Sequence, residues 1–100
     1  MTDTIYTVGQ LKTLLSPVFL RNDVRKAILF GSYVSGSASS KSDIDLYVDS
    51  GLRGLDFFGL LEEVVQVLDK DVDLIEKSDV IAGSLIDKEI SSSGVLLYEK

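Results

Sequence analysis

The stretch from Ser42 to Asp49 constrains the fold of this chain more than any other part of the sequence. Apolar residues alternate strictly along it with acidic or aromatic ones: Ile44, Leu46 and Val48 against Asp43, Asp45, Tyr47 and Asp49. Because successive side chains of a strand point to opposite faces, this alternation predicts a strand with one apolar and one acidic face. Such a strand belongs to a sheet that is covered on its apolar side.

The rest of the chain supplies the neighbours of this strand. Apolar residues recur at helical spacing from Val8 to Phe19, where Thr7 is a candidate N-cap and Pro17 is expected to end the helix or start a separate turn. Asn22-Asp23 then reads as a turn. Short apolar runs predict a buried strand at Ala27–Phe30, a third strand at Val72–Ile75 and an edge strand at Val95–Tyr98.

Two more helices are expected between these strands. Leu55 to Leu68 is amphipathic, with Phe57 and Phe58 in its apolar face. A last helix, capped by Ser78 or Asp79, has apolar residues at helical spacing and ends at Gly94; these residues are Ile81, Leu85, Ile86 and Ile90. The order of elements predicts an α/β (or α+β) fold, with a small mixed sheet flanked by helices.

Composition limits the chemistry available to the chain. Its 100 residues fit one domain, residues 1–100, and the N-terminus has no basic and apolar signal segment. No apolar run is long enough to span a bilayer.

The chain contains no Cys and no His, which excludes thiolate catalysis, imidazole bases and zinc sites built on those residues. The net charge of −6 argues against an extended nucleic-acid surface. Acid–base or metal chemistry must therefore use carboxylates, hydroxyls, lysine or backbone, which favours hard cations such as Mg²⁺.

The segment after the first strand is suited to binding a phosphate. Gly31-Ser32 lies where an apolar run gives way to a Gly- and Ser-rich segment that extends to Ser42. Glycine lets the backbone approach a ligand closely, the following amides can point at a phosphate, and a serine hydroxyl adds one donor. A flexible loop is the alternative for the segment as a whole, and a helix N-cap is the alternative for Ser32.

Ten residues later the chain returns with Asp43 and Asp45. These two residues lie on the same face of a strand, with Cα atoms about 7 Å apart, so their carboxylates can converge on one cation or on two neighbouring ones. Asp73 is the best candidate for a third carboxylate, because it is an acid inside an otherwise apolar strand. Asp71 shares its face by alternation, but it stands beside Lys70, where a solvated ion pair is expected. A solvent-facing acidic edge is the alternative for all of these acids.

Gly-Ser followed, after ten intervening residues, by Asp-x-Asp resembles the defining motif of the nucleotidyltransferase fold of the DNA polymerase β superfamily. The order of the predicted elements is similar to that of its smallest branch, the minimal nucleotidyltransferases (MNT domains). The resemblance extends from the N-terminal helix through Val72-Asp73-Leu74-Ile75 to Gly94-Val95-Leu96-Leu97-Tyr98, nearly the whole chain.

The resemblance implies a function. Ser32, with Gly31, would contact the triphosphate of ATP or another nucleotide, while Asp43 and Asp45 would hold Mg²⁺ (or Mn²⁺). Asp73 would be the third catalytic and metal-binding carboxylate. The reaction would transfer a nucleoside monophosphate, AMP from ATP, to a hydroxyl and release pyrophosphate. The implied acceptor is a helical HEPN-type partner, toward which a cytoplasmic MNT protein acts as antitoxin; a second copy of the chain is the other acceptor considered.

One departure from the family pattern leads to an alternative function. Family members often carry an arginine shortly after Gly-Ser, but Tyr33, Val34 and Ser35 are uncharged. Since a triphosphate favours a cationic clamp, Lys41 and Arg53 are the nearest candidates to supply one, and Lys41 is the closer to the motif. The alternative is a binding module that keeps the fold and neutralises its partner by docking, with little or no catalysis.

Overall fold

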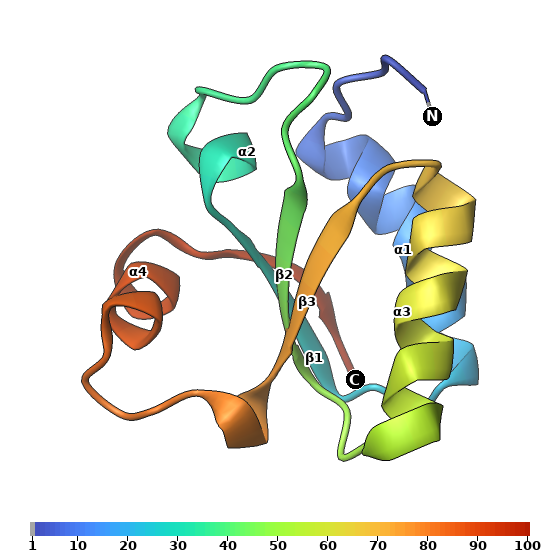
Figure 1. Ribbon diagram of the computed structural model, residues 1–100, viewed down its shortest axis with the longest axis vertical. Helices are drawn as coiled ribbons and strands as arrows, with labels where there is room; N and C mark the ends of the chain where they lie inside the picture. The colour runs from blue at the N-terminus through green and yellow to red at the C-terminus, as the bar shows by residue number, and fades with distance from the viewer. Residues whose placement is uncertain (1) are drawn as a thin grey trace.

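The computed structural model describes residues 2–100, which form one four-stranded sheet with helices on both sides (Figure 1). The strands are β1 (Lys26–Phe30), β2 (Ile44–Asp49), β3 (Val72–Glu76) and β4 (Val95–Glu99), and the helices are α1 (Val8–Arg21), α2 (Ser32–Ser35), α3 (Gly54–Leu68) and α4 (Leu85–Ser93), with a 3₁₀ turn η1 (Lys77–Asp79). The strand order is β3-β2-β1-β4. β1 runs antiparallel to β2 and β4, whereas β2 and β3 are parallel, so the predicted small mixed sheet is confirmed.

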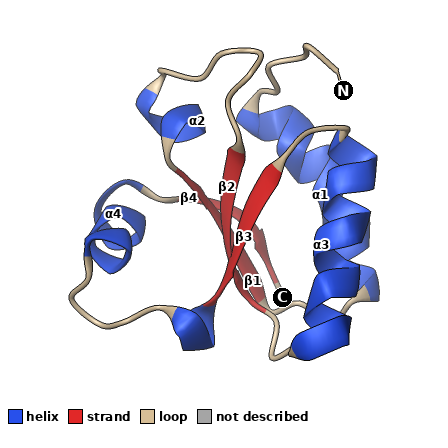
Figure 2. Ribbon diagram, viewed as in Figure 1, coloured by secondary structure: helices blue, strands red, loops and turns tan. Residues whose placement is uncertain are grey.

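The two faces of the sheet are covered differently. α1 and α3 pack side by side on one face, whereas α2 and α4 lie on the opposite side (Figure 2). The predicted apolar face of β2 is confirmed, because Ile44, Leu46 and Val48 are fully buried in the core under α1 and α3. The acidic face of β2 therefore points to the side of α2 and α4.

Helix α1 begins as predicted and runs further than predicted. Thr7 caps it, and the side chain of Gln10 reciprocally accepts from the Thr7 amide in a capping box. Pro17 was expected to end the helix, which is wrong: the helix continues to Arg21. The buried residues Val18 and Phe19 continue its apolar stripe, and their packing outweighs the one backbone hydrogen bond that Pro17 cannot make.

Helix α3 is confirmed, but one of its aromatic residues is placed differently. Its buried residues are Leu60, Val64 and Leu68, which recur every four positions. Phe58 is 53% exposed, contrary to its predicted place in the apolar face. Two positions from Leu60 correspond to a rotation of about 200°, which turns Phe58 away from the sheet. Among residues 2–100, no helix combines the length and the hydropathy that crossing a membrane requires.

The start of α4 was predicted too early. Ser78 and Asp79 belong to the 3₁₀ turn η1, and Ser84 is the residue whose side chain caps α4 by accepting from the Asp87 amide. Gly83, with a φ of 80°, separates the two segments. Ile81 lies outside the helix, and of the four apolar residues that suggested it only Ile90 is buried. Gly94 ends the helix and β4 forms one edge of the sheet, as predicted.

Candidate functional site

The register of the sheet brings the three predicted acids together. In the parallel ladder between β2 and β3, Asp45 pairs directly with Asp73. Adjacent strands are about 4.8 Å apart, so these two side chains stand next to each other on the same face. Asp43 precedes β2 by one residue, two positions before Asp45 and toward the same face. On its other side Asp45 pairs with Phe30, the last residue of β1, immediately before the Gly-Ser turn.

The electrostatics of this cluster are centred on Asp45. Its carboxyl is partly buried, whereas Asp43 and Asp73 are exposed. Burial is the main cause that raises the pKa of Asp45 to about 6, and the negative charges of Asp73, Asp43 and Glu89 raise it further. At neutral pH the protein therefore holds a carboxylate that its surroundings disfavour, as expected of a group that awaits a cation.

This electrostatic cost predicts that Asp45→Asn stabilises the metal-free protein. The folded pKa of Asp45, about 6, lies above its ordinary value of 3.8, so the folded state binds more protons than the unfolded chain between these pH values. Wild-type stability should therefore fall as the pH rises from about 4 to 6. After solvent screening we expect a gain of about 1 kcal/mol for Asp45→Asn at pH 7, or roughly 5 °C in Tm. Calorimetric melting in the presence of EDTA measures this, and a lower Tm would show that Asp45 is a structural hydrogen-bonding residue.

The Gly-Ser turn is packed directly against Asp45. Gly31 caps the short helix α2 with φ 76° and ψ −147°, in the region that favours glycine. A Cβ atom at this position would overlap the Oδ2 atom of Asp45. Ser32 is the first residue of α2 and makes no capping hydrogen bond, so the N-cap alternative for Ser32 is wrong. The absence of a side chain at Gly31 is what lets the turn and the acidic strand meet.

Glu89 is a site residue that sequence reasoning missed. It comes from α4, and its Oε2 atom accepts a hydrogen bond of 2.9 Å from the amide of Gly31. In the sequence it follows Lys88 on a helix with several polar residues, so it looks like any solvated helical acid. Only the tertiary position of α4 against β1 brings it to the Gly-Ser turn.

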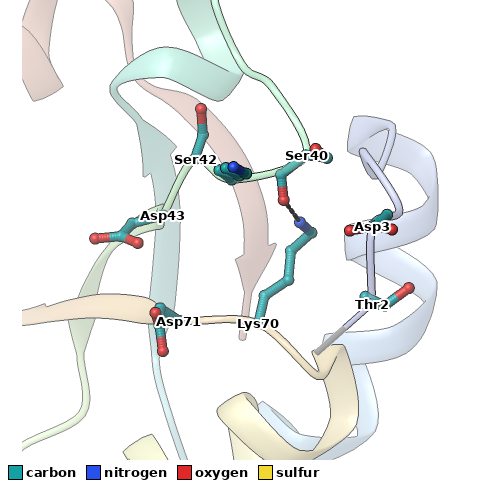
Figure 3. Close-up of a pocket in the computed structure, with 8 residues that line it drawn as sticks. Thr2, Asp3, Ser40, Ser42, Asp43, Lys70 and Asp71 are labelled. Atoms are coloured by element: carbon teal, nitrogen blue, oxygen red, sulfur yellow. Dashed lines mark hydrogen bonds between the residues drawn. The ribbon is translucent and has the colours of Figure 1, made fainter.

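A polar cavity of about 270 Å³ adjoins the acids (Figure 3). Lys41 lines it together with Asp43, which places the predicted cation beside a predicted metal ligand. Lys70 was expected to form a solvated pair with Asp71, and this is wrong: Lys70 is only 3% exposed and donates to the carbonyl of Ser40 at 2.7 Å. Figure 3 shows this side chain running toward Ser40. Lys70 thereby ties the loop that carries Asp43 to the start of β3.

Arg53 does not reach the site. It caps α3, beyond the end of β2 that is opposite to Asp43 and Asp45. There it lines a different cavity, together with Glu76 and Asp79. The suggestion that Arg53 replaces the arginine of the family pattern is therefore wrong, because Arg53 lies beyond one end of β2 and the acids lie at the other end.

The donor set fits a hard cation. Every candidate ligand at the site is an oxygen of an aspartate, and burial together with the neighbouring acids Asp73, Asp43 and Glu89 raises the pKa of Asp45, so a bound cation would stabilise its charged form. Within residues 2–100, no three His, Cys, Asp or Glu side chains are arranged to hold a metal ion by themselves. Mg²⁺ is typically held by one or two carboxylates plus water and substrate phosphates, and Asp43 and Asp45 match that pattern. Metal binding by Asp43, Asp45 and Asp73 stays a prediction.

Comparison with known proteins agrees with the geometry. The family model described as polymerase β, nucleotidyltransferase, matches residues 13–100. A Methanocaldococcus jannaschii protein named "Putative protein adenylyltransferase MJ0435" is 32% identical over 75 residues, which cover 73% of this chain and 81% of that protein. A crystal structure of a toxin–antitoxin with AMP-PNP matches with a TM-score of 0.76 at 24% identity, covering 89% of this chain and 73% of the other. A solved structure of the tri-AMPylated Shewanella oneidensis HEPN toxin in complex with MNT antitoxin also contains a matching chain. The match has a TM-score of 0.71 at 20% identity and covers 94% of this chain and 74% of the other.

Proposed function

Since the chain belongs to the polymerase β nucleotidyltransferase family, we propose that it transfers AMP from ATP to a hydroxyl group of a protein partner. The observation that carries the proposal is the convergence at one place of Asp45, Asp73 and the Gly31 turn. The similarity to a protein named as an adenylyltransferase supports AMP as the transferred group. In this proposal, residues 1–100 form a single minimal nucleotidyltransferase domain.

The site assigns a task to each residue. The amide and the hydroxyl of Ser32 bind the triphosphate, and Gly31, whose own amide donates to Glu89, shapes the turn that presents them. Lys41 contributes positive charge from the adjoining cavity. Asp43 and Asp45 hold Mg²⁺ or Mn²⁺, with Asp73 nearby as third ligand. When bound, the ion neutralises carboxylate and phosphate charge. The acceptor oxygen attacks the α-phosphorus, the bond to pyrophosphate breaks, and Asp73 takes the hydroxyl proton.

The acceptor is proposed to lie outside the described residues. The described residues fold around one sheet that carries the acids, and no second unit faces them. The similar solved structures include an AMPylated HEPN toxin in complex with an MNT antitoxin, which supports a HEPN-type partner and an antitoxin role in the cytoplasm, where ATP is available. A second copy of the chain is the other acceptor we test.

A second candidate function is neutralisation of the partner by docking without catalysis. The observation that favours it is the uncharged segment after Gly31-Ser32, together with the remote position of Arg53. Transfer from labelled ATP, with the HEPN-type partner present or absent, separates the two functions. Label on the partner supports transfer; label on the chain itself identifies a second copy as acceptor. Binding without label in the presence of Mg²⁺ supports docking.

Metal binding can be tested independently of the acceptor. We expect Mn²⁺ to bind more tightly in the presence of a nonhydrolysable ATP analogue, because phosphate oxygens complete its coordination shell. In calorimetry, the double variant Asp43→Asn/Asp45→Asn should lose the metal-dependent part of the heat. Asp56→Asn, an exposed acid in the first turn of α3, is the control and should bind like wild type. Equal metal-dependent binding in the double variant and wild type would refute the assignment.

A further inference from the structure

We propose that Glu89 is a positioning residue of the nucleotide site: its carboxylate holds the Gly31 turn in the conformation that receives the phosphates. This inference rests on the proposed function, because it concerns the same turn. It assigns to α4 a part in substrate binding, although α4 carries none of the residues of the Gly-Ser or Asp-x-Asp motif.

The hydrogen bonds around Gly31 support this role. The Gly31 carbonyl accepts from the amides of Val34 (3.0 Å) and Ser35 (3.1 Å), the contacts that close α2. Its amide has the Glu89 carboxylate as its partner, at 2.9 Å. The carbonyl of Gly31 is thus held by the helix that follows, and its amide is held by a residue 58 positions away in the sequence. Without the Glu89 contact, the amide side of Gly31 would lose its hydrogen bond, and glycine has few steric limits of its own to hold φ and ψ.

The helix that carries Glu89 is itself firmly placed. Ile90, the next residue, is buried, and Gly94 lies so close to Ile28 of β1 that a Cβ there would overlap that side chain. α4 is therefore seated on the strand that leads into Gly31. Although the Glu89 side chain is exposed, its backbone is held at a fixed position relative to the turn.

The position of Glu89 also has an unfavourable consequence. Its charge adds to the negative charge that Asp45 already meets from Asp43 and Asp73. The other acids of the site disfavour a further negative charge at this place. A hydrogen bond from an amide to a carboxylate is, however, stronger than one to a neutral acceptor, and this favours the contact. The contact therefore matters for the shape of the turn more than for the charge of the site, and the amide of glutamine should largely replace it.

Three variants test this inference. Glu89→Ala removes the contact, Glu89→Gln keeps an acceptor without the charge, and Lys88→Ala alters the neighbouring exposed position as control. We expect Glu89→Ala to weaken binding of a nonhydrolysable ATP analogue with Mg²⁺ by about tenfold, the loss of one hydrogen bond to a charged group. Glu89→Gln should stay within about threefold of wild type. In ¹H–¹⁵N spectra without nucleotide, the Gly31 amide proton should move upfield in Glu89→Ala and much less in Glu89→Gln.

The outcomes separate this inference from the proposed function. If wild type does not bind the analogue, the proposed function is wrong, and the Gly31 resonance still tests the contact. If wild type binds and Glu89→Ala binds equally well, the inference is wrong. Tighter binding by Glu89→Ala would show that the carboxylate competes with phosphate, which overturns the inference. Equal weakening in Glu89→Ala and Glu89→Gln would overturn it as well, since charge would then be the cause.

Discussion

Asp73→Ala is expected to slow the transfer of AMP by a factor of about 10² to 10⁴ while ATP binding stays largely intact. The proposed task of Asp73 is to accept the proton of the acceptor hydroxyl, and a general base typically contributes a factor of this size. Its position supports the task, because it pairs with Asp45 in the parallel ladder and its side chain is exposed to an incoming acceptor. Single-turnover transfer from labelled ATP, with the partner supplied, measures the effect.

Asp71→Ala is the matched control for this prediction. Asp71 is also exposed and lies two positions earlier in the chain, before β3 begins, where it lines the cavity near Asp43. We expect its removal to change the rate little. An inactive Asp71→Ala with an active Asp73→Ala would reverse the assignment of the third acid. If both variants are active while Asp43→Ala is inactive, the site works with two carboxylates.

Gly31→Ala is expected to destabilise the protein and abolish nucleotide binding. The φ and ψ of Gly31 lie in a region that disfavours any side chain by about 1 to 3 kcal/mol, and the added Cβ would overlap the Asp45 carboxylate, at a further cost of about 1 to 3 kcal/mol. Either the turn or the Asp45 side chain must then move, and each movement changes the position of the Asp45 carboxylate relative to the Ser32 amide. Thermal melting measures the first effect, and calorimetry with the ATP analogue and Mg²⁺ measures the second.

Gly36→Ala is the control that separates strain from overlap. Gly36 ends α2 with φ 82° and ψ 8°, in the left-handed region, and a Cβ there would meet nothing within 4 Å. This variant should lose only the contribution of its own positive φ, which is smaller than that of Gly31 with its ψ of −147°, and should keep nucleotide binding. If both alanine variants lose the same stability and both still bind the analogue, the contact between Gly31 and Asp45 has no part in shaping the site.

The parts of the molecule that local pattern determines were predictable from the sequence. Alternation along Ser42 to Asp49 gave the faces of β2 correctly, because one-sided burial imposes a period of two residues. Thr7 with Gln10 indicated the start of α1, because the capping box is a short-range arrangement. The Gly-Ser turn and the acids Asp43 and Asp45 could be recognised together in the sequence, because only the short segment of residues 33–42 separates them.

The errors arose where tertiary packing overrides a local signal. Pro17 is tolerated because the core holds the residues that follow it. Ile81 matches the helical spacing but lies before α4, and Leu85, at the start of α4, is largely exposed. Lys70 was expected in a solvated ion pair and Glu89 was not singled out, yet each reaches a backbone group in a distant segment. No feature of the sequence near either residue records that distant partner, so only the folded arrangement reveals it.

The alternation along β2 also protects the chain against a specific folding error. A slip of β2 by one residue would turn Asp45, Tyr47 and Asp49 toward α1 and α3 and would expose Ile44, Leu46 and Val48 on the other face. Burying the two aspartates would cost several kcal/mol for each charge. The acids that are proposed to hold the metal thus make the misaligned sheet unstable, so a substitution such as Asp45→Val would remove a proposed metal ligand and weaken strand alignment at the same time.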